Sequence, residues 1–374
     1  MLITDLSTPQ VLVDRSRLVA NIARTQSAVT SVHLRLRPHA KTHKSPVIAQ
    51  WQMNQGGVGI CCAKVGEAEI FADFGIPDIR LAYPVSPANA DRLLRLMDRA
   101  RVSIAVDHLA IARQWSDLMQ HAGRRLDVLV KVDVGFHRCG IDPKPPGSTR
   151  FIRQVAALPG LKVKGLMSYT GQAYSATSDS DLAQMVEAEA RTLRIITENA
   201  EEAGVAIEEV SVGSTPTFRF NLQQRGVTEL RAGSYIYGDR TQVAFGAMSL
   251  EDCALTVVAT VVSMPAKDRL VLDCGSKTLG LDPVRGFGVN RGYGIICATM
   301  ETERPDENLL IDQLSEEYAV VKVVGRPTDL GPGDKVRILP NHACVVSNLT
   351  DCIHLVEGQD VVETLPVAAR GKVT

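Results

Sequence analysis

Short apolar runs alternate with amphipathic segments through the first two thirds of the chain. Between residues 15 and 30 the apolar positions Leu18, Val19, Ile22 and Ala23 recur at helical spacing, which predicts a helix ahead of the first core strand. The later apolar runs are separated by further helical patterns and predict strands near residues 33–37, 57–61, 78–82, 101–105, 126–133, 161–168, 207–212 and 228–231. Eight strands that alternate with helices predict an α/β fold of the (β/α)8 TIM-barrel type.

An open, doubly wound sheet is the competing arrangement for this pattern. It would need a glycine-rich loop after the first strand, and the segment that follows residues 33–37 contains no glycine before residue 56. In a barrel, the working groups lie on the loops that follow the strands. We therefore look for chemistry in those loops.

The pattern changes after about residue 240. Segments rich in Val, Ile and Leu, with little helical periodicity, occur at residues 255–262, 269–273, 318–324 and 335–339, and turn residues such as Gly331 to Asp334 separate them. With 374 residues the chain is long for one compact unit. The prediction is a barrel over residues 1–240 and a separate β domain over residues 241–374.

Composition and charge favour small-molecule chemistry. The 41 basic and 42 acidic residues leave a net charge of -1, which provides no field to attract nucleic acid or a membrane surface. The N-terminal residues MLITD lack the features of a signal peptide, and no apolar run approaches the ~20 residues of a membrane helix. Together with eight scattered cysteines that form no C-x-x-C pair, this predicts a cytoplasmic protein with free thiols.

The candidate for covalent chemistry is Lys41, in the segment RPHAKTHK at residues 37–44. A lysine at the end of a buried strand can be desolvated, which lowers its pKa and frees its amine to attack carbonyls. On these residues alone, a solvated cationic turn is the alternative. The phosphate-binding and ring-binding signals after later strands favour a Schiff-base lysine.

The strongest phosphate signal follows the seventh predicted strand, in the segment VGSTPT at residues 212–217. Small residues at Gly213, Ser214 and Thr215 allow backbone N–H groups to converge on an anion, and Pro216 suits the first turn of a short helix whose N-terminus favours negative charge. A plain helix cap would need only one Ser or Thr.

A second set of backbone donors follows the eighth predicted strand, at Gly233, Ser234 and Tyr235. Barrels commonly bind phosphate on the loops after strands seven and eight. The two loops together predict a phosphate site.

Two further loops offer contacts for a ring. Arg138 lies on a glycine-flanked loop after the fifth strand and could hydrogen-bond a phenolate oxygen, with a surface arginine as the alternative. Tyr169 follows the sixth strand near Gly171. Because buried tyrosines are also common in protein cores, a structural role is the alternative for Tyr169.

A possible metal site lies in the predicted β domain, in the segment LPNHAC at residues 339–344. Residues i and i+2 of an extended strand project to the same face, so His342 Nε2 and Cys344 Sγ could bind one ion. A thiolate favours zinc over manganese or magnesium. The alternative is a core cysteine beside a structural histidine.

These motifs resemble those of the D-threonine aldolase and D-serine dehydratase family, pyridoxal-phosphate enzymes that share the fold of alanine racemase. The segment around Lys41 is similar to the family's pyridoxal-phosphate lysine segment, and the likeness runs from Thr8 to Gly371. It implies pyridoxal 5'-phosphate on Lys41, contacts from Arg138 and Tyr169, Arg231 against the pyridine nitrogen, and a divalent metal on His342 and Cys344. It also implies a homodimer and catalytic roles for Lys41, Tyr169 and His342.

The resemblance leaves the reaction on a small D-amino acid open. Cys344 and residues 212–216 are closer to the dehydratase branch, whereas residues 168–171 are closer to the aldolases; residues 315–319 lack a histidine that many members have. We expect cleavage of a D-3-hydroxy amino acid to glycine and an aldehyde, as in D-threonine aldolase. The main alternative is a D-serine or D-3-hydroxyaspartate dehydratase. An amino acid racemase and a non-catalytic pyridoxal-phosphate-binding protein are the remaining alternatives.

Overall fold

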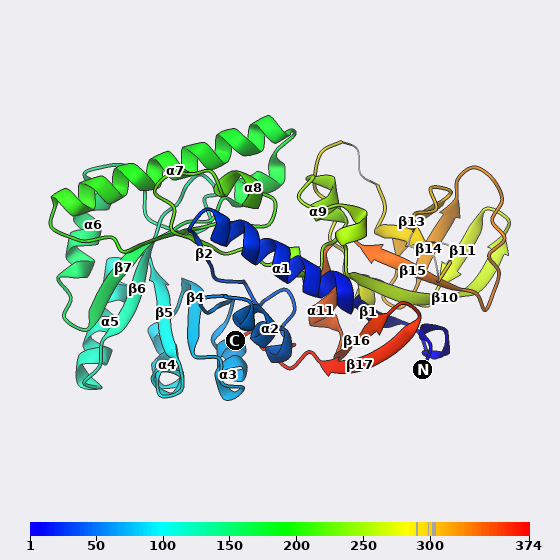
Figure 1. The fold of residues 1–374 in the computed structure, drawn as a ribbon, viewed down its shortest axis with the longest axis horizontal. Coiled ribbons are helices and arrows are strands. Elements are labelled where there is room, and N and C mark those ends of the chain that lie inside the picture. The colour runs from blue at the N-terminus through cyan, green and yellow to red at the C-terminus, as the bar shows by residue number, and fades with distance from the viewer. Residues whose placement is uncertain (289–290, 298, 301–303) are drawn as a thin grey trace. The chain divides into compact units, whose positions relative to one another are not determined.

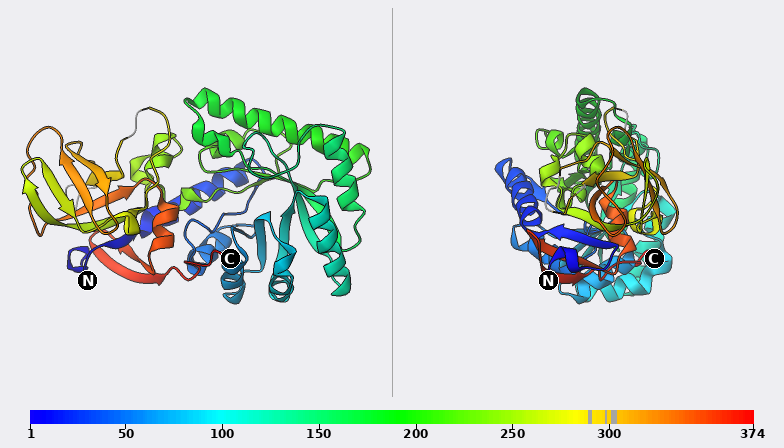
Figure 2. Two further views of the ribbon diagram at one scale, coloured as in Figure 1. Left: turned by 180° about the vertical axis from the view of Figure 1, so that it is seen from behind. Right: turned by 90° about the vertical axis from the view of Figure 1, so that its right-hand side faces the viewer.

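The computed structural model describes residues 1–288, 291–297, 299–300 and 304–374. The chain forms two compact units (Figures 1 and 2). The barrel unit contains residues 25–41, 48–233 and 372–374, and the β unit contains residues 1–24, 42–47 and 234–371. The domain boundary between residues 240 and 241 stays a prediction. The sequence pattern did not indicate that residues 1–24 would belong to the same unit as the C-terminal segment.

The barrel unit is built on one eight-stranded, all-parallel sheet in the order β2-β9-β8-β7-β6-β5-β4-β3. The edge strands β2 and β3 are joined by a parallel bridge between His39 and Cys61, with a 2.8 Å bond from Ala40 N–H to the Cys61 carbonyl. The sheet therefore closes, and the predicted (β/α)8 fold is confirmed. The strands are β2 (Arg35–Leu36), β3 (Ile60–Cys62), β4 (Asp78–Pro84), β5 (Arg101–Val106), β6 (Leu126–Lys131), β7 (Leu161–Met167), β8 (Glu209–Val212) and β9 (Glu229–Leu230).

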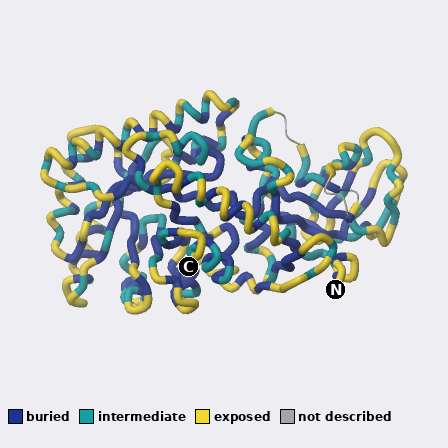
Figure 3. The backbone as a smooth tube through the Cα atoms, viewed as in Figure 1, coloured by how far each residue is buried: buried dark blue, intermediate teal, exposed yellow. Residues whose placement is uncertain are grey.

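Burial follows the hydrophobic pattern (Figure 3). In β6 the residues Val128, Leu129 and Val130 are fully buried, as expected for a parallel strand covered on both faces. The helices that accompany the sheet are α1 (Arg15–Ser31), α2 (Pro46–Asn54), α3 (Val65–Asp73), α4 (Ala90–Met97), α5 (Leu109–His121), α6 (Gly147–Ala156), α7 (Asp179–Glu202) and α8 (Phe218–Asn221). The predicted helix over residues 15–30 corresponds to α1 and is confirmed. None of the helices in the described ranges combines the length and the apolar composition needed to cross a bilayer.

A buried ion network joins three strands of the barrel, β4, β8 and β9, to the residue that follows β2. Glu229 accepts hydrogen bonds from Arg37 Nε at 2.9 Å, from Ser211 Oγ at 2.6 Å and from Arg80, and Arg80 Nη2 also donates to Glu209 at 2.6 Å. Burial by itself would raise the pKa of Glu229, but the charges of Arg80 and Arg37 and the bond from Ser211 lower it to about 2. Glu229 is therefore held as a carboxylate inside the barrel.

The β unit contains a nine-stranded sheet in the order β13-β14-β11-β10-β1-β16-β17, in which β15 pairs with β10 and with β12. The N-terminal strand β1 is antiparallel to β10 and parallel to β16, which explains why the first residues of the chain belong here. The predicted segments 255–262, 269–273, 318–324 and 335–339 correspond to β10, β11, β14 and β15.

The β unit is built from the following strands and short helices. The strands are β1 (Gln10–Asp14), β10 (Leu255–Ala266), β11 (Arg269–Leu272), β12 (Gly294–Cys297), β13 (Leu309–Leu314), β14 (Ala319–Val323), β15 (Lys335–Pro340), β16 (Cys352–Glu357) and β17 (Asp360–Pro366). The helices are α9 (Arg240–Ala244), α10 (Ser276–Leu279) and α11 (Ala343–Leu349). Short 3-10 turns in the two units are η1 (Ile3–Asp5), η2 (Pro87–Asn89), η3 (Gly171–Ser175), η4 (Ser234–Ile236) and η5 (Leu250–Asp252).

Candidate active site

The barrel unit carries most of the predicted site residues on loops at one end of its sheet. Because all eight strands are parallel, the loops that follow them leave from the same end. These loops contain, after β2, β6, β7, β8 and β9 respectively, Lys41, Arg138, Tyr169, the segment 213–215 and Arg231. The alternation of strands and helices thus gathers residues that are distant in sequence.

Lys41 lies five residues beyond the end of β2. Its backbone N–H lies 3.5 Å from His39 Nδ1, and the preceding residue, Ala40, is fully buried. The side chain of Lys41 itself is exposed, so the expectation that this lysine is desolvated is wrong. The buried strand ends before Lys41 and leaves its amine accessible to a carbonyl compound.

Arg138 and Tyr169 lie together, with a third residue that the sequence did not single out. The Arg138 guanidinium carbon is 4.9 Å from the ring centroid of Tyr169 and 5.1 Å from that of Phe136. The two rings meet edge to face, with centroids 5.7 Å apart. These cation–π and aromatic contacts link the loops after β6 and β7. Phe136 lacked a signal because half-exposed aromatic residues are common in loops.

Replacing Gly171 with alanine is expected to disturb this cluster. A Cβ atom on Gly171 would lie 2.5 Å from Cδ1 of Phe136. Because the Phe136 ring is 38% exposed, it can turn away, so we expect the free energy of unfolding to fall by about 1 kcal/mol. Urea unfolding would measure the loss, and near-ultraviolet circular dichroism would report the displaced ring. A Cβ atom added to Gly147 would have no neighbouring atom within 4 Å, so Gly147→Ala is the control. An equal loss of unfolding free energy in the two variants would contradict the prediction.

The predicted phosphate loop after β8 is built from small, buried residues. Gly213 has a φ of 119°, which favours glycine, and Ser214 and Thr215 are buried. The Ser214 N–H donates to Thr217 Oγ1 at 3.2 Å, and the two hydroxyls lie 3.0 Å apart. The prediction that Pro216 opens a helix is wrong, because α8 begins at Phe218 and has four residues. The loop therefore offers neutral donors, and the helix that follows it is a single short turn.

Arg231 ties β8 to the residue that follows β7, from inside the barrel. Its Nε donates to Ser211 Oγ at 2.8 Å, and its Nη2 donates to the carbonyls of Ser211, at 3.2 Å, and of Ser168. Arg231 is 4% exposed. The second predicted set of donors is divided between the units, because Gly233 belongs to the barrel unit whereas Ser234 and Tyr235 belong to the β unit.

Two buried ionisable residues near these loops were missed in the sequence. Lys131 ends β6 and is 2% exposed; burial and the positive charges of Arg231 and Arg138 lower its pKa to about 7. Glu189 on α7 accepts a hydrogen bond from Ser168 Oγ, and burial raises the pKa of this carboxyl. A lysine at the end of the apolar run LDVLVK was the available signal for the first, whereas Glu189 lies among many surface carboxylates of α7.

The predicted metal pair lies in the β unit, but on a different element from the one expected. The strand β15 ends at Pro340, His342 is the N-terminal cap of α11, and Cys344 lies in the first turn of that helix. The expectation of an extended strand through residue 344 is therefore wrong. The side chain of Cys344 is nevertheless hydrogen-bonded to that of His342. Burial lowers the pKa of His342, but the charge and hydrogen bond of Cys344, the charge of Asp239 and the hydrogen bond with Asp282 outweigh burial and raise this pKa to about 10.

Each ligand candidate has further partners in the β unit. His342 Nδ1 is hydrogen-bonded to Asp282 Oδ2, which leaves Nε2 as the other ring nitrogen. Cys344 Sγ lies 3.3 Å from Thr42 Oγ1 and 3.6 Å from Ser234 Oγ. Across the described ranges, no cluster of three or more His, Cys, Asp or Glu side chains could hold a metal. A metal on His342 and Cys344 would thus have positions left for water or substrate.

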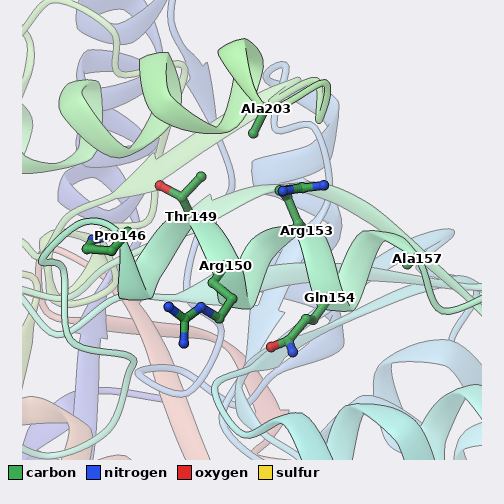
Figure 4. Close-up of a pocket in the computed structure, with 7 residues that line it drawn as sticks. All are labelled: Pro146, Thr149, Arg150, Arg153, Gln154, Ala157 and Ala203. Atoms are coloured by element: carbon green, nitrogen blue, oxygen red, sulfur yellow. The ribbon is translucent and has the colours of Figure 1, made fainter.

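A hollow of about 470 Å³ lies along α6 and includes Ala203. Figure 4 shows that the guanidinium groups of Arg150 and Arg153 point to different sides of the helix. They do not converge on one anion. None of the predicted site residues lines this hollow. Its lining residues come from α6 and the chain next to it and from the end of α7, and not from the loops that carry Lys41, Arg138 and Tyr169.

Comparison with known proteins relates both units to enzymes. Residues 13–241 match the family described as alanine racemase, N-terminal domain, and residues 254–356 match a serine dehydratase domain. D-threonine aldolase of Arthrobacter sp is 32% identical over 98% of this chain and 93% of the relative. D-threo-3-hydroxyaspartate dehydratase of Delftia sp. (strain HT23) is 30% identical over 91% of each chain.

Solved structures of that dehydratase superpose closely on this chain. A cysteine-to-alanine variant in the metal-free form has a TM-score of 0.91 and 28% identity over 98% of both chains. A histidine-to-alanine variant has a TM-score of 0.92 and 28% identity over 98% of this chain and 96% of the other. The replaced residues of the two variants are two positions apart, which is also the spacing of His342 and Cys344.

Proposed function

Because the chain belongs to the alanine racemase N-terminal domain family and its C-terminal part matches a serine dehydratase domain, we propose that it is a pyridoxal-phosphate-dependent lyase of D-3-hydroxy amino acids. The reaction we favour is that of a D-threonine aldolase, which cleaves the substrate to glycine and an aldehyde. The observation that carries the proposal is that Lys41 and the segment 213–215 leave the same end of a closed parallel barrel. Relatives of this chain at 30–32% identity are lyases of such substrates by name.

The residues present suit pyridoxal 5'-phosphate. Lys41 has an accessible amine for the cofactor's aldehyde, and the neutral donors of Gly213, Ser214 and Thr215 suit its phosphate. When bound, the cofactor supplies an electron sink for the electron pair left at Cα. We assign Arg138 and Tyr169 to the face of the ring and Arg231 to its nitrogen. Gly233, Ser234 and Tyr235 are proposed to add donors to the phosphate.

The donor set of the β unit suits zinc. An imidazole and a thiol at His342 and Cys344 are typical zinc ligands, whereas manganese and magnesium prefer carboxylates. When bound, the metal would act as a Lewis acid on the substrate's 3-hydroxyl. The replaced cysteine and histidine of the two dehydratase variants have the same two-residue spacing, which supports a metal pair at His342 and Cys344.

Side chains of the protein would carry out the proton transfers, and these differ between the two reactions. In the aldolase reaction the 3-hydroxyl would give its proton to a base as the Cα–Cβ bond breaks, the aldehyde would leave, and Cα would then take up a proton to give glycine. His342 and Tyr169 are the proposed groups around that hydroxyl and the ring. In the dehydratase reaction Lys41 takes the Cα proton and hydroxide leaves. Cys344, where an aspartate would be closer to the aldolases, is the specific feature that favours the dehydratase as the second candidate.

A racemase and a cofactor-binding protein fit less well. A racemase would use a second base on the opposite face and would need no metal pair such as His342 and Cys344. A protein that only binds the cofactor has no evident need for a β unit of this size. Neither alternative accounts for the lyase names of the two relatives.

The test is product analysis with D-threonine and added zinc. Acetaldehyde together with glycine is the expected result, and 2-oxobutanoate with ammonia would instead support the dehydratase. Chelation, or His342→Ala, is expected to lower the rate by about 10²-fold or more, because the hydroxyl is then no longer activated. If the cofactor-loaded, zinc-loaded protein formed neither acetaldehyde nor 2-oxobutanoate from D-threonine, and neither formaldehyde nor pyruvate from D-serine, the proposal would be contradicted.

By resemblance to the family, we also propose a homodimer that works in the cytoplasm. Sedimentation of the purified chain would measure its mass against the 40.5 kDa of one subunit. A single species of monomer mass at working concentration would overturn the dimer.

A further inference from the structure

We infer that Asp282 is the positioning residue of the metal site: its carboxylate holds the Nδ1 of His342 and so directs Nε2 to the ion. This inference rests on the proposed function, because it concerns the zinc assigned there to His342 and Cys344. The bond joins His342 Nδ1 to Asp282 Oδ2, across 60 positions of sequence. A carboxylate on the second nitrogen fixes the tautomer and orientation of a ligating imidazole and raises its basicity.

The loop that carries Asp282 is anchored beside His342. The side-chain amide of Asn341, which is 2% exposed, donates to the carbonyls of Asp282 and Gly292, both at 3.0 Å. Arg240 Nη1 donates to the Gly292 carbonyl at 3.3 Å and lies 3.4 Å from Asn341 Oδ1. Asn341, the residue before His342, therefore holds the backbone at Asp282, whose carboxylate in turn contacts His342.

The residues after His342 are fixed from another direction. The Ala343 N–H donates to Asp239 Oδ2 at 3.0 Å, and the other carboxylate oxygen of Asp239 accepts from the Gln242 N–H at 2.9 Å. Asp239 is fully buried and caps α9. Since Cys344 follows, the backbone between the two ligands is held in place. Among the described residues, Asp282 is the carboxylate that is hydrogen-bonded to the imidazole ring itself.

A surface ion pair without a role at the metal is the competing explanation. The side chains of His342 and Asp282 are 40% and 47% exposed, which is compatible with such a pair. The two explanations differ in what the loss of Asp282 changes. A positioning residue alters the affinity for the ion, whereas a simple surface pair alters neither affinity nor fold appreciably.

The experiment measures zinc affinity in Asp282→Asn, by competition with a chromophoric chelator at neutral pH on the cofactor-loaded full chain. The expected result is a rise of about 10- to 100-fold in the dissociation constant for zinc. Asp312→Asn is the matched control, because Asp312 forms one ion pair with Lys322 in the same unit, at 2.8 Å, and has no contact with His342 among the bonds described. Its zinc affinity is expected to match the wild type.

Cobalt substitution separates weakened binding from a collapsed site. At saturating cobalt, Asp282→Asn is expected to show the wild-type thiolate-to-cobalt absorption band, because Cys344 is untouched. A variant with wild-type zinc affinity, an equal loss in Asp312→Asn, or a missing cobalt band at saturation would each overturn the positioning role while leaving the lyase assignment in place. A wild-type chain that binds no zinc would overturn the positioning role together with the zinc assignment on which it rests, whereas the lyase assignment is tested separately by product analysis.

Discussion

Lys41→Ala is expected to abolish the lyase reaction and the visible absorption of the bound cofactor. The substitution removes the amine that would hold the cofactor and, in the dehydratase reaction, the proposed base for the Cα proton as well. Because both reactions need the cofactor's electron sink, we expect the rate to fall by at least about 10³-fold, within the range of about 10²- to 10⁴-fold that loss of a general base alone would give in the dehydratase reaction. Absorption spectra before and after borohydride, with rates measured in the same preparation, would check the result.

The exposure of Lys41 makes this loss specific to chemistry. Removing an exposed side chain usually changes the free energy of unfolding by about 0.5 kcal/mol or less, so the variant should remain folded. Lys162→Ala is the control: Lys162 is an exposed lysine at the other end of the sheet, paired with Glu208 at 3.4 Å. A Lys41 variant that keeps a borohydride-sensitive band would show that another lysine holds the cofactor.

Glu229→Ala is expected to lower the free energy of unfolding by about 3–5 kcal/mol, because it leaves Arg37 and Arg80 as buried cations without this partner. The difference between the ordinary pKa of 4.5 and about 2 in the folded protein corresponds to about 3 kcal/mol, in agreement with that range. Urea unfolding at neutral pH is the measurement. Asp98→Ala, which breaks an exposed pair with Arg124, should cost about 1 kcal/mol or less.

The pH dependence of this effect has a definite sign. The folded pKa of Glu229 is lower than its unfolded value, so the unfolded state binds more protons between about 2 and 4.5. The stabilisation is complete above pH 4.5 and is lost as the pH falls toward 2. The difference in the free energy of unfolding between the wild type and Glu229→Ala should therefore become smaller as the pH falls from 4.5 to 2. A difference that does not change with pH would mean that the substitution destabilises the protein only by leaving a cavity.

Local pattern was sufficient for the architecture and for part of the site. The apolar pattern predicted α1 and the positions of the eight parallel strands, since a helix with one buried face has apolar residues at helical spacing, whereas a parallel strand buried on both faces is a short continuous apolar run. Because parallel strands send their loops to one end, the same pattern grouped Lys41 with Arg138, Tyr169 and residues 213–215. The likeness of short motifs to a known family then supplied the cofactor.

Only the tertiary structure shows which charged residues pair when the partners are distant in sequence. Glu229 meets Arg80 across 149 positions, and His342 meets Asp282 across 60, and no local pattern records which charges will share a buried site. It also decided the exposure of Lys41 and the helical start at Ala343, which the strand pattern alone placed incorrectly. Periodicity reports which face of an element is buried, whereas burial and pairing of a given charge depend on the elements that pack around it.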